Sequence, residues 1–269
     1  MPPWVDFEPF IVSGLALGGV YALSGVGLVV LYRATGVLYL AFGAVGALGA
    51  LIAWSLITRA GAPGWAGWLV CVAVAAAVTL GYGTLFGPAL AKRNPLVKAV
   101  ATIGLTLILY GAMDLLWTTS GGQARSLTLP TDNGGFTVGT VQVTWTQVIA
   151  LGAGVVLTVA TVALLSMSGG ILGGLLAGIA GLLLADLVAL DATTLTFLVI
   201  SSLAAVLVAG LRSIPLTFVA AIVVGLLHDL LTPIVALTNY RDMTPFVIAA
   251  IGLLVLSRHR VIVTSREEA

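Results

Sequence analysis

The chain has 269 residues, of which 60% are hydrophobic and 8% charged, and its formal net charge is +1. An average soluble domain carries about 25% charged residues, so this composition excludes an ordinary soluble protein, and the near-neutral charge gives no indication of nucleic-acid binding. The 53 residues from 133 to 185 contain no charged side chain. At roughly 20 residues per spanning helix, that stretch is long enough to cross a bilayer twice.

The sequence therefore predicts an all-α polytopic membrane protein, a transmembrane helix bundle forming one domain over residues 1–269 with eight to nine spans. Its first residues lack the basic region and small-residue cleavage site of a removable signal peptide, so we expect the first span to be retained. The expected spans lie near 10–32, 37–58, 65–86, 99–119, 145–167, 171–190, 192–211, 215–237 and 244–257.

Glycines are concentrated on two of these spans. Helices in lipid associate through small residues, because lipid tails remove the hydrophobic drive for association. We therefore expect two packing faces, one formed by Gly14, Gly18 and Gly19 and the other by Gly43, Gly46 and Gly49.

The distribution of basic residues predicts the orientation, since lysine and arginine in short loops stay preferentially on the cytoplasmic side. With the amino terminus outside, three arginines fall outside: Arg59, Arg125 and Arg241. Eight basic residues then fall inside: Arg33, Lys92, Arg93, Lys98, Arg212, Arg258, Arg260 and Arg266. The carboxyl terminus is thus predicted to be cytoplasmic, in a bacterial plasma or inner membrane.

Two connections between the spans are polar. Residues 120–144 are expected outside and contain an alternating stretch after Asn133-Gly134, which predicts a short hairpin. The inner loop 87–98 is basic. It is interpreted either as a topology signal that contacts phospholipid or as a contact for a cytoplasmic partner.

The sequence contains no catalytic signature, neither a nucleophile elbow nor a phosphate-binding glycine loop nor an HExxH motif. The two histidines lie far apart, which offers little for a metal site, and Cys71 is interpreted as a small buried hydrophobe. We therefore expect no catalytic residue, no metal and no cofactor.

Ionisable residues within spans often mark a pathway, because charge in lipid is costly. Asp114 either lies at the membrane interface beside Trp117 or lines a polar path. His228 is either a proton site or an interhelical hydrogen-bonding residue. The adjacent Asp229 diverges from His228 by about 100° on a helix, which argues against a mutual relay.

Several short motifs follow one another along the chain. They are Tyr21-Ala22-Leu23, Gly27-Leu28, Arg33-Ala34-Thr35-Gly36, Thr102-Ile103-Gly104-Leu105 and the segment GLRSIPLTFVAAIVVGLLHDLL from Gly210. In this arrangement the chain resembles the branched-chain amino acid permeases of ABC transporters, the LivH type. Gly36 is expected to let the chain turn back at once into the second span, and Thr102 and Thr106 to share a helical face.

The resemblance implies a permease subunit that imports branched-chain or related apolar amino acids by alternating access and forms half of the translocation path. It also implies a second permease, ATP-binding subunits that hydrolyse the ATP, and an extracytoplasmic solute-binding protein. The path residues are then expected to be Tyr39, Thr102, Gly104, Thr106, Asp114 and His228. Contacts with cytoplasmic partners are expected at Arg33, Lys92, Arg93 and Arg212.

Two departures from the family pattern leave alternatives open. The chain reads Tyr39-Leu40-Ala41-Phe42-Gly43 where the family has Asn-Phe-Ala-His-Gly, and only SMSGG stands where the family has a long cytoplasmic segment that docks on the ATPase. One alternative is a membrane paralogue that lacks coupling. Another is a secondary transporter or channel that uses Asp114, His228 or Asp229 as proton or ion sites.

Overall fold

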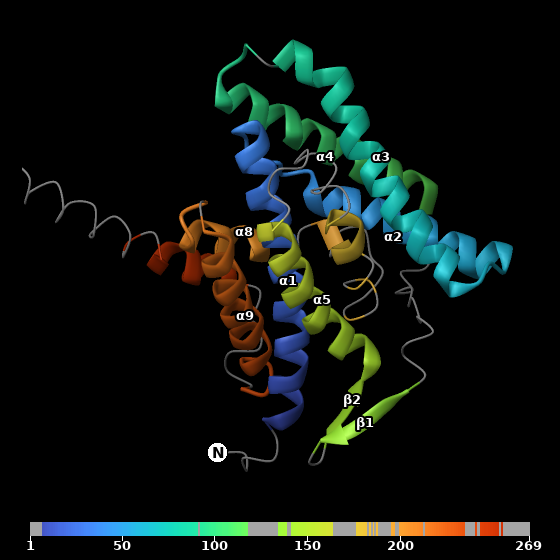
Figure 1. The fold of residues 1–269 in the computed structure, drawn as a ribbon, viewed down its shortest axis with the longest axis vertical. Helices are drawn as coiled ribbons and strands as arrows, with labels where there is room; N and C mark the ends of the chain where they lie inside the picture. Colours follow the sequence, from blue (N-terminus) through green and yellow to red (C-terminus); the bar gives the residue numbers. More distant parts are fainter. Residues whose placement is uncertain are drawn as a thin grey trace, which may run out of the picture.

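The computed structural model describes residues 7–90, 92–117, 134–138, 141–163, 176–181, 199–211, 213–234 and 243–252, with shorter pieces at 183, 185, 187, 195–196, 240 and 254. The chain is mostly helical (Figure 1). Its elements are α1 (Glu8–Thr35), α2 (Phe42–Ala60), α3 (Gly64–Leu90), α4 (Pro95–Trp117), β1 (Gly135–Val138), β2 (Val141–Thr144), α5 (Trp145–Ala163), α8 (Val199–Val208) and α9 (Ile214–Leu230). Residues 176–181 and 244–252 are also helical.

Helix α1 forms the centre of the molecule. It has a proline in its first turn, where a missing N–H costs nothing, and nearly all of its apolar length is buried. Helices α5, α8 and α9 pack around it. It ends at Gly36, whose φ of 70° is left-handed and whose N–H donates to the Tyr32 carbonyl at 2.7 Å. The turn expected at Gly36 is thus confirmed, because glycine adopts this conformation without strain.

The first predicted packing face is confirmed by the contact between α1 and α9. A Cβ placed on Gly18 would lie 2.8 Å from the Ile222 Cα, and one placed on Gly225 would lie 2.4 Å from the Gly18 Cα. Such distances leave no room for a side chain, so the two backbones touch directly. Gly14 lies against Leu226 while Gly18 lies against Ile222, so the two helices run antiparallel.

The remaining face glycines also make backbone contacts. Gly19 packs against Ala150 and Leu151 of α5, and a Cβ on Gly43 would lie 2.5 Å from the Thr196 carbonyl oxygen. Gly46 packs on the helical segment 176–181, and Gly49 packs against Cys71 of α3. The second predicted face is therefore confirmed. Cys71 is buried as expected, and its thiol donates to the Gly178 carbonyl at 3.2 Å.

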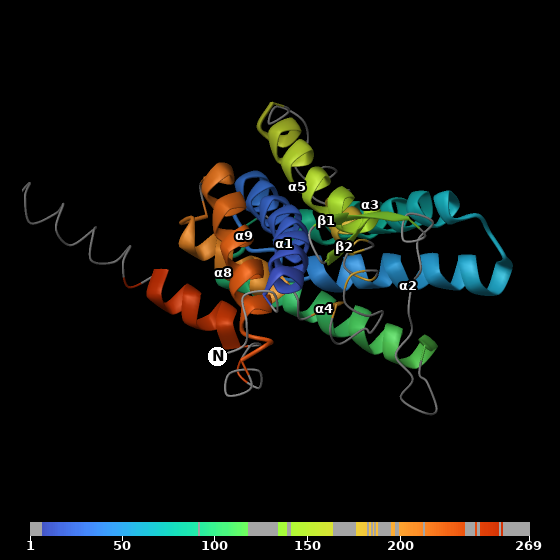
Figure 2. The ribbon, with the colours of Figure 1, turned by 90° about the horizontal axis from the view of Figure 1, so that it is seen from below.

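Helices α2, α3 and α4 form a second group beside the C-terminal half of α1. Figures 1 and 2 show α2 leaving α1 sideways instead of returning alongside it. Within this group α2 packs on α3 and α4, and the Trp117 indole N–H of α4 donates to the Ser55 hydroxyl of α2 at 2.7 Å. The structure thus contains two helical groups that meet at the C-terminal end of α1.

The predicted hairpin is confirmed. Strands β1 and β2 pair antiparallel, with Gly135 opposite Thr144. The backbone N–H of Trp145 donates to the Gly134 carbonyl at 3.1 Å, and the Trp145 ring packs on Phe136. The hairpin leads directly into α5.

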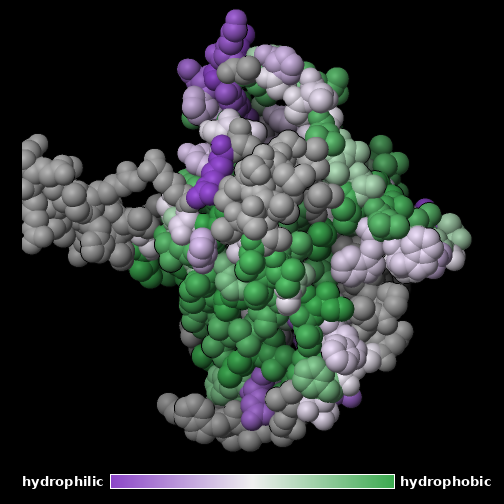
Figure 3. All heavy atoms as spheres, viewed as in Figure 1, coloured by the Kyte–Doolittle hydropathy of each residue, from purple (hydrophilic) through white to green (hydrophobic). Residues whose placement is uncertain are grey.

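Four of the described helices are long and apolar enough to cross a membrane: Glu8–Arg33, Phe42–Ala60, Gly64–Leu90 and Pro95–Trp117. Three shorter apolar helices are Trp145–Val159, Val199–Val208 and Ile214–Leu230. A helical bundle compatible with a membrane location is therefore confirmed, and the surface shown in Figure 3 is largely apolar along its flank. More than half of the predicted span 171–190 and the end of the predicted span 244–257 lie outside the described residues, so the order of eight to nine spans and its orientation stay predictions.

The contact between α1 and α9 can be tested with Gly225→Ala. We expect this change to lower the free energy of unfolding by about 1–3 kcal/mol, because the new methyl group overpacks against the Gly18 backbone. The matched control is Gly104→Ala, since nothing lies within 4 Å of a Cβ there; it should be neutral or stabilising by up to about 1 kcal/mol. Unfolding in detergent followed by circular dichroism measures both, and equal stability of the two variants would contradict the packing.

Candidate functional site

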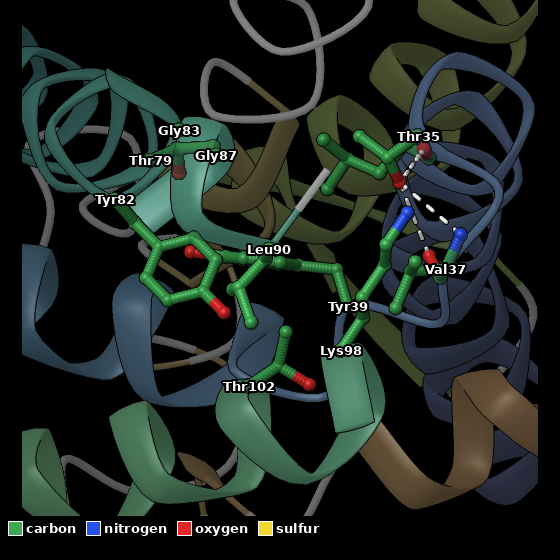
Figure 4. Close-up of a pocket in the computed structure, with 11 residues that line it drawn as sticks. Thr35, Val37, Tyr39, Thr79, Tyr82, Gly83, Gly87, Leu90, Lys98 and Thr102 are labelled. Atoms are coloured by element: carbon green, nitrogen blue, oxygen red, sulfur yellow. Dashed lines mark hydrogen bonds between the residues drawn. The ribbon is translucent and has the colours of Figure 1, made fainter. Parts of the chain in front are cut away.

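A cavity of about 380 Å³ lies where the end of α1, the α1–α2 loop, α3 and the start of α4 meet (Figure 4). Its volume falls within the roughly 300–1,000 Å³ of small-molecule sites. The lining residues are Leu31, Thr35, Val37, Tyr39, Thr79, Tyr82, Gly83, Gly87, Leu90, Lys98 and Thr102. It is therefore the candidate site, and we call it the α1–α3–α4 pocket.

Thr102 fixes one wall of this pocket. Its buried hydroxyl accepts a hydrogen bond from the Leu40 N–H at 3.3 Å. The same hydroxyl has two possible acceptors for its proton, the Leu38 carbonyl at 3.3 Å and the Ala99 carbonyl at 2.8 Å. Because Leu38 and Leu40 belong to the α1–α2 loop, Thr102 fastens that loop to α4.

Two tyrosine rings line the pocket. Tyr39 extends from the α1–α2 loop, is 7% exposed, and meets the ring of Tyr82 edge-on with the centroids 5.7 Å apart. Both hydroxyl oxygens are fully buried, and that of Tyr39 faces the side chain of Thr79. The two rings, not their hydroxyl groups, therefore form this part of the wall.

Lys98 supplies the positive charge of the pocket from the first turns of α4. Its side chain runs along the wall toward Thr35 at the end of α1 (Figure 4). The Thr35 hydroxyl donates to the Leu31 carbonyl at 2.7 Å and accepts from the Val37 N–H at 3.3 Å. Among the described lining residues none is acidic and Lys98 is the cation.

The α3 wall is formed by residues at helical spacing. Thr79, Tyr82, Gly83 and Gly87 all line the cavity, and the intervals of three, four and eight residues place them on one face of the helix. A Cβ at Gly83 or Gly87 would meet no atom within 4 Å. These two glycines thus leave space in the pocket, unlike those that bring α1 and α9 together.

Of the predicted path residues, the structure brings Tyr39 and Thr102 together in this pocket. Thr106 lies one turn further along the same face of α4, and its hydroxyl donates to the Thr102 carbonyl at 3.0 Å. Gly104 does not line the pocket, and it makes no close packing contact, since the space around it is open.

Asp114 and His228 lie elsewhere. Asp114 is exposed on α4, about 24 Å along the helix from Lys98 at 1.5 Å per residue. His228 is partly buried on α9, and its neighbour Asp229 accepts a hydrogen bond from the Ser13 hydroxyl near the opposite end of α1. Asp229 thus joins two helices. Among the described residues, no three His, Cys, Asp or Glu side chains converge on a metal site.

The predicted partner contacts lie around the same end of the molecule. Arg33 is exposed in the last turn of α1, and Lys92 and Arg93 are exposed between α3 and α4. Figure 3 shows hydrophilic side chains gathered where α3 and α4 connect. Arg212 lies outside the described residues.

Lys98 belongs to the basic loop predicted from the sequence and not to the predicted path, and the predicted path also lacks Thr79, Tyr82, Gly83 and Gly87. The spacing of these four α3 residues in TLGYGTLFG is a pattern that could have indicated a polar face. Lys98 lies one turn before Thr102, and the same spacing argument places the two on one side of α4.

Comparisons with protein-family models, with curated proteins and with solved structures gave no match for this chain. The resemblance to branched-chain amino acid permeases therefore stays a prediction from the motifs.

The role of Thr102 can be tested with Thr102→Val. Removing the hydroxyl leaves the Leu40 N–H without this hydrogen-bond acceptor. We expect this loss to lower the free energy of unfolding by about 1–3 kcal/mol, the usual cost of an unpaired buried donor. Hydrogen exchange at the Leu40 amide should therefore accelerate. The matched control is Thr106→Val, whose hydroxyl bonds only within its own helix and whose loss should leave Leu40 unchanged. Equal exchange at Leu40 in the two variants would show that Thr102 does not hold the loop.

Proposed function

We propose that this chain is the permease subunit of an ABC importer for branched-chain or related apolar amino acids and forms half of the translocation path. The α1–α3–α4 pocket is the inner part of that path. ATP hydrolysis takes place in separate subunits, and the chain works with a second permease and an extracytoplasmic solute-binding protein.

One observation carries this proposal. Thr35, in the Arg33-Ala34-Thr35-Gly36 motif, and Thr102, the first residue of the Thr102-Ile103-Gly104-Leu105 motif, lie more than 60 residues apart in sequence and line the same cavity. Two separate motifs of the family pattern thus contribute to adjoining walls of one cavity. This arrangement supports the interpretation that the motifs together build one site.

The composition of the pocket suits a small apolar solute. Leu31, Val37 and Leu90 offer apolar surface, and hydroxyls and one ammonium group supply a few polar contacts. Binding sites for small molecules have this character, mostly apolar with a small number of placed polar groups.

The surroundings of the pocket suit the proposed partners. Arg33, Lys92 and Arg93 are exposed at this end, where charges can reach an acidic surface of an ATP-binding subunit. The outer faces of α3 and α4 expose large apolar side chains, among them Leu69 and Leu85 of α3 and Leu107 and Leu115 of α4. Such faces suit contact with lipid or with a second permease.

The direct test is co-expression of the chain with its candidate ATP-binding subunits, second permease and solute-binding protein, followed by leucine uptake into vesicles. We expect a stable complex and uptake that requires ATP. Uptake driven by a proton gradient without ATP-binding subunits would instead identify a secondary transporter. Normal membrane insertion without binding of the ATP-binding subunits would identify a paralogue that lacks coupling.

The pocket can be tested in the same assay with Gly83→Leu. The added side chain enters open space in the cavity, and we expect uptake to fall by about tenfold or more, equivalent to about 1.4 kcal/mol of lost binding. The matched control is Gly111→Leu on α4, which also faces open space but does not line the pocket. Similar uptake by the two variants would exclude this cavity from the path.

A further inference from the structure

We propose that the α1–α3–α4 pocket recognises its ligand by the carboxylate, held by Lys98, and does not recognise an amino group. The inference rests on the proposed function only in taking the ligand to be an apolar solute of amino-acid size. It identifies Lys98 as the residue that determines specificity, a role that the sequence motifs do not give it.

The charges in the pocket favour an anion. Of the residues that the structure describes around the pocket, Lys98 carries a positive charge and none carries a negative one. Inside a partly desolvated cavity an ion pair gains more than in water, because the effective dielectric constant is lower. A ligand ammonium placed in the same cavity would be repelled by Lys98 and would find no carboxylate to neutralise it.

The rest of the cavity takes the apolar body of the ligand. Leu31, Val37 and Leu90 provide contact surface, and the open space at Gly83 and Gly87 provides volume. A short branched aliphatic carboxylate matches both the cation and the apolar walls of the pocket. A branched amino acid also fits, but its amino group adds nothing to binding.

The test compares three ligands on the purified chain in nanodiscs of neutral lipid, by calorimetry. Leucine carries both groups, 4-methylpentanoate lacks the amino group, and 3-methylbutylamine lacks the carboxylate. We expect 4-methylpentanoate to bind at least as tightly as leucine. The amine should bind about tenfold or more weakly than either, because it loses the desolvated charge pair. An amine that binds as tightly as the acid overturns the proposal.

Substitutions of Lys98 test whether this residue causes the preference for a carboxylate. Lys98→Gln should weaken 4-methylpentanoate binding by about tenfold or more, and Lys98→Arg should retain most of it. The matched control is Arg59→Gln, which removes an exposed charge outside the pocket and should leave binding unchanged. Unfolding curves that match for Lys98→Gln and Lys98→Arg separate lost binding from lost folding. Equal binding by Lys98→Gln and the unaltered chain overturns the proposal.

An anionic lipid headgroup could also pair with the Lys98 ammonium group. The assay is therefore repeated in nanodiscs that contain phosphatidylglycerol. The expected result is unchanged binding of 4-methylpentanoate. If phosphatidylglycerol abolishes binding and the Lys98→Gln variant no longer retains this lipid during purification, the pocket is a lipid site and the proposal fails.

The role of Lys98 and the importer function can be contradicted independently of each other. Selective carboxylate binding to the isolated chain, together with no ATP-dependent uptake in the complex, would contradict only the importer. ATP-dependent leucine uptake that is unaffected by Lys98→Gln would contradict only the role of Lys98.

Discussion

Direct backbone contact between helices is the constraint on which the structure depends. Lipid offers no hydrophobic gain when apolar helices associate, so close van der Waals contact must hold them together. Gly18 and Gly225 bring α1 and α9 together, and Gly19 brings α1 against α5. Because these contacts bury most of α1, the position of its C-terminal end is fixed. That end places Thr35, Gly36 and the α1–α2 loop, from which the pocket is built.

The pocket lies at the junction of the two helical groups, not inside either one. Leu31 and Thr35 belong to the group around α1, and the α3 and α4 walls belong to the other. The Thr102 hydroxyl fastens α4 to the loop that joins the groups. Any displacement of one group against the other would therefore change the pocket and these bonds together. A ligand that binds one arrangement better would shift the equilibrium toward it.

Sequence reasoning succeeded where local chemistry decides the outcome. Glycine spacing identified both packing faces, Gly36 identified the turn, and Asn133-Gly134 with its alternating residues identified the hairpin. It failed where long-range contacts decide. Helix α3 is apolar on every side, so its sequence does not show which face meets α2 and which lines a cavity. The contact of Thr102 with Leu40 joins residues more than 60 positions apart, which no local pattern encodes.

The two side chains that depart from the family motif have different consequences. Phe42 is buried, and a Cβ on Gly27 would lie 2.5 Å from its ring, so this position is committed to packing against α1. Tyr39 keeps a polar side chain, and its ring lines the pocket while its hydroxyl is fully buried. Polarity is therefore lost from the loop at residue 42 but kept at residue 39. The charge among the described lining residues comes from Lys98 of α4, which lies outside the motifs that carry the resemblance.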